Sequence, residues 1–251
     1  MFYVKKADFD SSNTVTKYDE FFSAQTEVTS VVREAIQNVI DASPTGSSEP
    51  ARAKFSFKKI PWKEFSRFID TNDGYSMNEH WSCPALKKHL TDYSDQPVPT
   101  LAIEDYNTTG LVGSFDKDEE NSTSNLVNFW WNIGHGNKGK GTLGNAGIGK
   151  ITFTTASGMR TMWAVSKRLN EEFEPKVLLG YTDLPYHHVK GQSYLGYARY
   201  GIEEEHPSSG QTVLNPIVDH QSIEQFESCF GIDRDVPGLS IIIPAISEEF
   251  T

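Results

Sequence analysis

The sequence predicts an α+β two-layer sandwich, in which helices cover one face of a mixed, largely antiparallel sheet. The first observation is a strongly amphipathic helix near the N-terminus, over Thr26–Ala42. The second is a succession of apolar runs in the C-terminal half, which read as strands separated by short turns: 161–167, 176–181, 194–200 and 239–244. A meander of this kind is typical of an antiparallel sheet covered by the helices that precede it.

The length and composition indicate one soluble domain over residues 1–251, with residues 1–25 as an N-terminal arm or short helix. No apolar run approaches the roughly 20 residues that span a bilayer, and the two lysines near the N-terminus precede no apolar segment. We therefore expect a cytoplasmic protein without membrane contact. The formal charge of −11 argues against direct nucleic-acid binding by this segment, because phosphate contacts require clustered Lys and Arg.

The helix predicted over Thr26–Ala42 carries two faces with different chemistry. Its apolar residues recur at helical spacing, and we expect them to face a core: Val28, Val31, Val32, Ala35, Ile36, Val39 and Ile40. Its polar face aligns Glu34, Asn38 and Asp41 at i, i+4 and i+7, so that two carboxylates and a carboxamide project as one row. A solvated helix face more often carries Lys and Glu, and the row is therefore a candidate site.

The middle of the chain is predicted from shorter patterns. Residues 51–60 alternate as a half-exposed strand, residues 62–69 and 78–90 are helical, and a turn separates these helices at Asp73 and Gly74. Pro99–Asp105 is an apolar run that ends in two acids, which indicates a buried strand with carboxylates at its C-terminal end. Further helices are expected at 151–157 and 222–230.

The segment 134–150, GHGNKGKGTLGNAGIGK, contains seven glycines and three lysines. Glycines allow several backbone N–H groups to converge on an anion, so a nucleotide phosphate is the natural ligand. A flexible linker is the alternative. Gly139, Gly141 and Gly144 spell G-x-G-x-x-G but follow no strand, and Gly144–Lys150 spells G-x-x-x-x-G-K without the hydroxyl residue that completes a P-loop. The segment therefore matches neither the dinucleotide-binding motif nor the P-loop motif well.

A third pattern uses all three stretches in order: E-x-x-x-N-x-x-D-A from Glu34, a strand ending in Asp105 before Gly110, and a glycine cluster at 144–149. Together these resemble the Bergerat-fold ATPases, the group of gyrase B, Hsp90, MutL, MORC proteins and histidine kinases. The resemblance covers roughly residues 26–244, and it implies an ATP-binding domain with a lid at 106–149. Histidine kinases match less well, since Glu34 resembles the glutamate of the subgroup that hydrolyses ATP with water.

The resemblance assigns a role to each residue. Glu34 is the expected catalytic base for water, Asn38 the expected Mg²⁺ ligand, and Asp105 the expected acceptor for the adenine amino group. The phosphates are expected on the backbone at the start of a helix, from a cluster formed by Gly144, Asn145, Ala146, Gly147, Ile148, Gly149 and Lys150. Ser240 is expected to complete the adenine pocket, with Thr212 as the alternate.

Two features depart from the family pattern. The family usually reads D-x-G-x-G after the adenine-binding Asp, whereas this chain places Asn107 at the first glycine and Gly110 five residues after Asp105. The gyrase and MutL branch also uses a lysine from a following domain, so a truncated protein with further domains or partners is expected. The motifs resemble those of bacterial ATPases in antiviral defence or DNA maintenance, in which ATP drives lid closure and homodimerisation. A non-hydrolysing nucleotide-binding scaffold is the alternative function.

The other polar and aromatic residues predict no site. Adjacent His187 and His188 on a strand would point to opposite faces and could not share a metal ion. Cys83 and Cys229 are far apart and fit structural thiols. Trp130 and Trp131 are interpreted as core or lid packing rather than a base-stacking platform, because no basic groove accompanies them.

Overall fold

The computed structural model describes residues 1–8, 28–83, 93, 96–115, 124–131, 148–170, 174–206 and 209–246, with only the backbone described at 148–150. The predicted elements that fall elsewhere, including residues 84–90 and most of the glycine cluster, lie outside this part of the chain. Among the described residues, no helix combines the length and apolar character needed to cross a bilayer.

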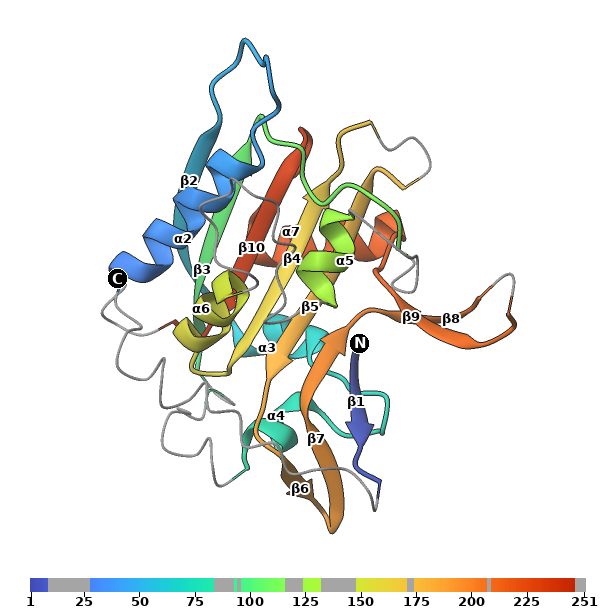
Figure 1. Ribbon diagram of the computed structural model, residues 1–251. Helices are drawn as coiled ribbons and strands as arrows, with labels where there is room; N and C mark the ends of the chain where they lie inside the picture. The colour runs from blue at the N-terminus through green and yellow to red at the C-terminus, as the bar shows by residue number, and fades with distance from the viewer. Residues whose placement is uncertain are drawn as a thin grey trace.

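An open sheet of eight strands forms the centre of the molecule (Figure 1). Its order is β1-β7-β5-β4-β10-β3-β2, and β6 pairs with the outer part of β7. The pairings between these named strands are all antiparallel. The strands are β1 (Phe2–Lys6), β2 (Arg52–Ile60), β3 (Val98–Tyr106), β4 (Thr161–Lys167), β5 (Lys176–Asp183), β6 (His187–Val189), β7 (Gln192–Tyr200) and β10 (Gly238–Pro244). A separate ribbon of β8 (Ile202–Glu205) and β9 (Thr212–Asn215) projects from the body.

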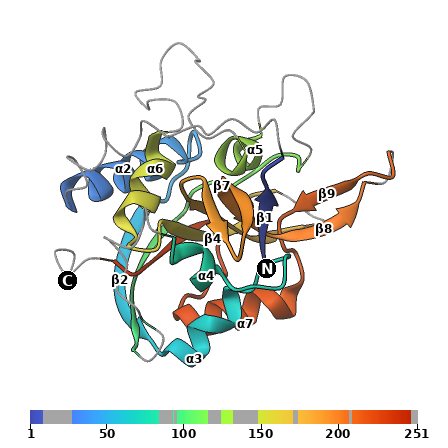
Figure 2. The ribbon, with the colours of Figure 1, turned by 90° about the horizontal axis from the view of Figure 1, so that it is seen from below.

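Helices cover both faces of the sheet, and the prediction that they cover one face is wrong (Figure 2). One face carries α2 (Val28–Asp41), α5 (Asn125–Trp130) and α6 (Ile148–Ala156). The opposite face carries α3 (Trp62–Phe65), the 3₁₀ turn η1 (Ser66–Phe68), α4 (Met77–Trp81) and α7 (His220–Phe230). The architecture is therefore α+β with three layers rather than two.

The central strands explain why the second face is covered. Every residue of β10 is buried, and alternate side chains enter different cores. Ile241 and Ile243 pack beneath α2 and α6, whereas Ile242 packs with Phe226 of α7. A continuous apolar run is typical of a strand buried on both faces, and the sequence GLSIIIP is such a run. The second layer of helices supplies the partner that this composition requires.

The helix α2 confirms the predicted element but buries a narrower face than expected. Its buried residues are Val31, Ala35 and Val39. The other apolar row is exposed: Val32 at 39%, Ile36 at 39% and Ile40 at 62%. Because these three are spaced by four residues, they form one stripe along the helix. The helix therefore packs through one apolar stripe and turns the neighbouring apolar stripe outward.

Two other predicted segments differ from the structure. Phe2–Lys6 forms the edge strand β1, paired with β7, where an arm or a short helix was expected. The helix expected over 78–90 begins one residue earlier at Met77 behind a capping box of Ser76 and Glu79, and it ends at Trp81. The turn at Gly74 is confirmed, and this glycine adopts a φ of 86°.

Candidate functional site

The polar row of α2 is partly enclosed. Glu34 and Asn38 are half-buried, whereas Asp41 is exposed and accepts a hydrogen bond from Gln37 Nε2 at 2.9 Å. Burial raises the pKa of the Glu34 carboxyl above its usual value, Arg33 opposes this, and Asp41 adds to it. A carboxylate with a raised pKa is suited to accept a proton. Glu34 and Asn38 therefore differ from Asp41 in their exposure to solvent.

Asp105 lies near the C-terminal end of β3 and is only 7% exposed. Leu101 and Ile103 of the same strand pack in the core beneath α2 and α6, and strand alternation places Asp105 on that side. Its Oδ1 accepts hydrogen bonds from Thr108 Oγ1 at 2.6 Å and from Leu239 N at 2.7 Å. Burial raises the pKa of Asp105, while these hydrogen bonds and the nearby Arg234 act in the opposite direction.

The loop after Asp105 adopts a geometry that the sequence left in doubt. Asn107, which stands at the family's first glycine position, has a φ of 62°. Asn tolerates this left-handed region better than most residues, and its side chain donates to Pro50 O at 2.9 Å. Gly110 also has a positive φ, of 65°. The loop therefore makes the left-handed turns with one asparagine and one glycine.

Gly110 fits the loop closely against the ends of β4 and β10. A Cβ at this position would lie 2.4 Å from Lys167 O and 2.6 Å from Ser166 Oγ. Gly110→Ala is expected to lower the free energy of unfolding by about 2–4 kcal/mol, because the left-handed backbone and the steric clash act together. Chemical denaturation measures the loss.

Gly46→Ala is the matched control for that change. Gly46 also has a positive φ, of 80°, but no atom lies within 4 Å of the position that a Cβ would occupy. The control therefore reports the backbone strain alone, at about 1 kcal/mol. Equal losses in the two variants would contradict a role for close packing at Gly110.

The C-terminal end of α2 is joined to the loop after Asp105. The backbone N–H of Thr109 donates to Ala42 O at 2.9 Å, directly after the last helical residue. Glu34 lies two turns before Ala42 on the same helix, and Asn38 lies one turn before it. Figure 1 shows α2 and α6 side by side over the sheet, and both contribute to one core. The structure thus brings the polar helix, the Asp105 loop and α6 to the same face.

The glycine cluster is described only where it enters α6. Ile148, Gly149 and Lys150 form the first turn of this helix, and the predicted helix over 151–157 is confirmed up to Ala156. Gly144, Asn145, Ala146 and Gly147 lie outside the described residues. The phosphate loop that the sequence predicts before this helix therefore stays a prediction.

The structure does not bring Ser240 beside Asp105. Ser240 pairs with Glu104, so its side chain projects toward the α7 side of the sheet. There it accepts hydrogen bonds from Arg234 Nε at 3.0 Å and Nη2 at 2.6 Å. The alternate, Thr212, begins the separate ribbon strand β9. Long-range register, which local pattern does not reveal, decides both placements.

Sequence reasoning missed Ser166, a buried hydroxyl on the Asp105 side of the sheet. Ser166 pairs with Leu239, and its Oγ accepts from Leu111 N at 2.8 Å and donates to Gly238 O at 3.0 Å. The alternation of Met162, Ala164 and Ser166 in β4 was the available pattern, because the first two pack beneath α2 and α6. The hydroxyl that contacts Asp105 directly is that of Thr108.

The residues at this face suit Mg²⁺ and a nucleotide in their chemistry. The amide oxygen of Asn38 and the carboxylate of Glu34 are hard oxygen donors on a half-buried surface. Within the described residues, no three His, Cys, Asp or Glu side chains are grouped to hold a metal ion by themselves. These donors fit a Mg²⁺ ion whose remaining ligands are phosphate oxygens and water.

Comparisons with known proteins give no family assignment. The chain matches no protein-family model and has no significant match among curated proteins.

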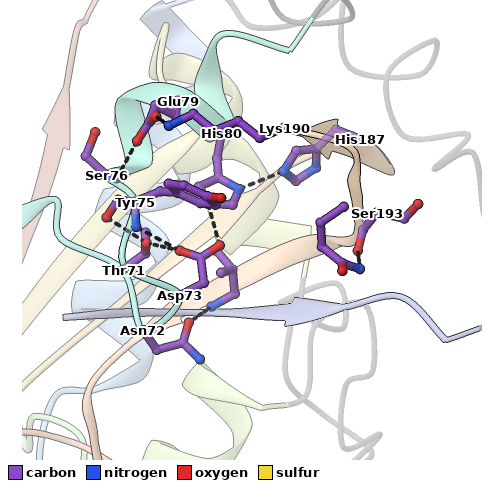
Figure 3. Close-up of polar contacts among 12 residues, drawn as sticks. Thr71, Asn72, Asp73, Tyr75, Ser76, Glu79, His80, His187, Lys190 and Ser193 are labelled. Carbon is purple, nitrogen blue, oxygen red and sulfur yellow. Dashed lines mark hydrogen bonds and ion pairs between the residues drawn. The ribbon is translucent and has the colours of Figure 1, made fainter.

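A second polar cluster lies on the opposite face of the sheet, where sequence reasoning expected none (Figure 3). His187 Nδ1 lies 2.8 Å from Pro185 O, which only accepts, so His187 donates there and its Nε2 accepts from His80 Nδ1 at 2.9 Å. His80 Nε2 lies 3.4 Å from Asp73 Oδ2. Both imidazoles are buried, whereas His188 is exposed, so the prediction that the two adjacent histidines face opposite sides is confirmed.

The buried histidines predict a loss of stability in mild acid. Burial lowers the pKa of His80, opposed by Asp73, and burial also lowers the pKa of His187, opposed by the Pro185 carbonyl. Below pH 6.5 the unfolded chain therefore binds protons that the folded chain does not. The free energy of unfolding should fall by about 1.4 kcal/mol per pH unit for each such proton. Urea denaturation between about pH 7.5 and 5.5 measures the slope.

The exposed neighbour provides the control for this pH dependence. His187→Gln should flatten the slope, whereas His188→Gln should leave it unchanged, because His188 is solvated in the folded chain. An unchanged slope in the His187 variant would show that these imidazoles do not control acid stability.

Proposed function

We propose that the chain is a Mg²⁺-dependent ATPase whose ATP site lies between α2, the Asp105 loop and the start of α6. The observation that carries the proposal is the hydrogen bond from Thr109 N to Ala42 O, which fixes the Asp105 loop to the end of the helix that bears Glu34 and Asn38. The position of α6 directly after the glycine cluster supports it further.

The proposal gives each side chain a separate task. Asp105, buried and hydrogen-bonded to Thr108, accepts a hydrogen bond from the adenine amino group. Asn38 would hold a Mg²⁺ ion with its amide oxygen, and the ion would supply positive charge beside the phosphates. Glu34 lies one turn earlier on α2 and takes a proton from the attacking water. The backbone N–H groups at the start of α6 orient the phosphates.

Nucleotide binding tests the site before turnover does. Isothermal titration should show ATP binding that needs Mg²⁺, that Asn38→Ala weakens about tenfold or more, and that Asp105→Asn weakens to a similar extent. Asp41→Asn is the control, because Asp41 is exposed on the same helix. Equal ATP affinity in all four proteins would place the nucleotide elsewhere.

We further propose that ATP binding drives homodimerisation, as part of a multidomain defence or DNA-maintenance protein. The exposed stripe of Val32, Ile36 and Ile40 lies on the helix that carries Glu34 and offers an apolar surface for a second copy. Sedimentation with a non-hydrolysable ATP analogue tests this step. A chain that stays monomeric with saturating nucleotide would contradict it.

A further inference from the structure

A cavity of about 550 Å³ lies at the β1–β7 edge of the sheet, on the side of α5. Its wall comes from strand β1, strand β7, the β8–β9 ribbon and Trp131, which directly follows α5. In the sheet order, β1 lies at one edge, whereas β3 with Asp105 lies next to the other edge. The cavity is therefore separate from the proposed ATP site, and its size is typical of small-molecule sites.

Arg199 is the central charge of this cavity. Its guanidinium lies over the rings of Trp131, at 4.4 Å, and Tyr197, at 4.8 Å, and its Nε donates to Trp130 O at 3.2 Å. Within the described part of the chain, no carboxylate forms an ion pair with Arg199. Burial lowers the pKa of Arg199, while Tyr181 and Tyr197 act in the opposite direction. A half-buried cation held by rings and a carbonyl retains donors for an anion.

A second cation faces the same side of the sheet as Arg199. Lys5 and Lys6 are exposed residues of β1 in the cavity wall, and neither forms an ion pair with a carboxylate among the described residues. Adjacent side chains on a strand point to opposite faces, so Lys5 lies on the side of Tyr3, which pairs with Arg199, whereas Lys6 lies on the other side.

The wall also contains two acids, Asp73 and Glu203. Asp73 accepts hydrogen bonds from Thr71 and Tyr75 and lies in the His80 cluster on the opposite face. Arg199 and Lys5 therefore face one acid, Glu203, in a chain whose net charge is −11. This local excess of positive charge favours an anionic ligand.

The remaining wall is aromatic and apolar, formed by Tyr3, Trp131, Tyr197 and Leu214. Sequence reasoning assigned Trp130 and Trp131 to packing because no basic groove accompanies them. Trp130 is indeed buried, at 1% exposure. Trp131 instead stacks with the guanidinium of Arg199 from β7, which only the folded chain brings beside it.

From this combination we infer that the cavity binds a small planar aromatic anion, of the class of aryl phosphates and aryl carboxylates. The ring packs against Tyr3, Trp131 and Leu214, and the anionic group accepts hydrogen bonds from Arg199 and Lys5. This binding requires neither Mg²⁺ nor the adenine-contacting Asp105, and it is independent of the proposed ATPase activity.

Isothermal titration with phenyl phosphate in the absence of Mg²⁺ tests the inference. Lys5→Gln should weaken phenyl phosphate binding by about tenfold, since this lysine supplies a charge-assisted contact. Arg199→Gln should weaken it at least as much. The matched control is Lys58→Gln, the same charge change on an exposed residue of β2 at the opposite edge, with less than about twofold effect.

Inorganic phosphate separates the two halves of the ligand. Phenyl phosphate should bind the wild-type chain about tenfold more tightly than inorganic phosphate, because the ring adds apolar contact with the wall. Equal affinities would overturn the aromatic assignment. Absence of phenyl phosphate binding, or equal binding by Lys5→Gln and the wild type, would overturn the site. The exposed position of Lys5 keeps this variant folded.

Discussion

Glu34→Gln is expected to reduce phosphate release by about 10²–10⁴-fold while ATP still binds with Mg²⁺. The amide keeps the size and hydrogen-bonding shape of the side chain but does not accept a proton from water. Because burial raises the pKa of Glu34, the wild-type rate should also fall as the pH drops through that raised pKa, where the base becomes protonated. A coupled assay of phosphate release at several pH values measures both effects.

The same helix supplies the control for this experiment. Asp41→Asn removes a carboxylate two turns away that is exposed and bonded to Gln37, and it should retain nearly the full rate. ATP bound by the wild type with equal phosphate release from Glu34→Gln would exclude Glu34 as the base. Binding without any phosphate release by the wild type would instead support the non-hydrolysing scaffold.

Arg234→Met is expected to lower the free energy of unfolding by about 3–5 kcal/mol. Arg234 is fully buried, and its guanidinium donates to Asp105 O, to Leu239 O at 2.9 Å and to Ser240 Oγ. Its charge also faces the buried acids Glu104 and Glu227. Methionine fills much of the volume but leaves the two carbonyls without their donor and removes the positive charge that faces these acids. Thermal and urea denaturation at neutral pH measure the loss.

Two further variants test whether the loss comes from the buried charge of Arg234. Arg234→Lys keeps the positive charge and should recover part of the loss, whereas Arg67→Met on the surface of η1 should change stability by less than about 0.5 kcal/mol. A loss in Arg234→Met as small as that of the surface variant would show that the buried charge is not needed for the fold.

The most accurately predicted elements are those with a strict, local sequence pattern. The periodicity of α2 and the apolar runs of β3, β4 and β10 placed these elements within one or two residues. The alternation rule for His187 and His188 also held, because side chains on a strand point to opposite faces. Element boundaries without strong patterns, such as the end of α4 at Trp81, were less accurate.

The candidate site was predictable in part. Asp105, Glu34 and Asn38 were selected from residue type and spacing, and the structure places their elements on one face of the sheet. Ser240 was selected in the same way but lies with Arg234 on the α7 side, whereas Ser166 occupies the Asp105 side. The difference arises because strand register, and not local composition, decides which hydroxyl faces which layer.

The sequence by itself determined the α+β class, the main helices and strands, and the polar row on α2. Only the tertiary structure decided that helices cover both faces, that His80 meets His187 at a separation of 107 residues, and that Lys5, Lys6 and Arg199 line one cavity. Local periodicity sets the conformation of a segment, since it depends on neighbours in the chain. The partner of each face depends on packing between distant segments, which only the folded chain defines.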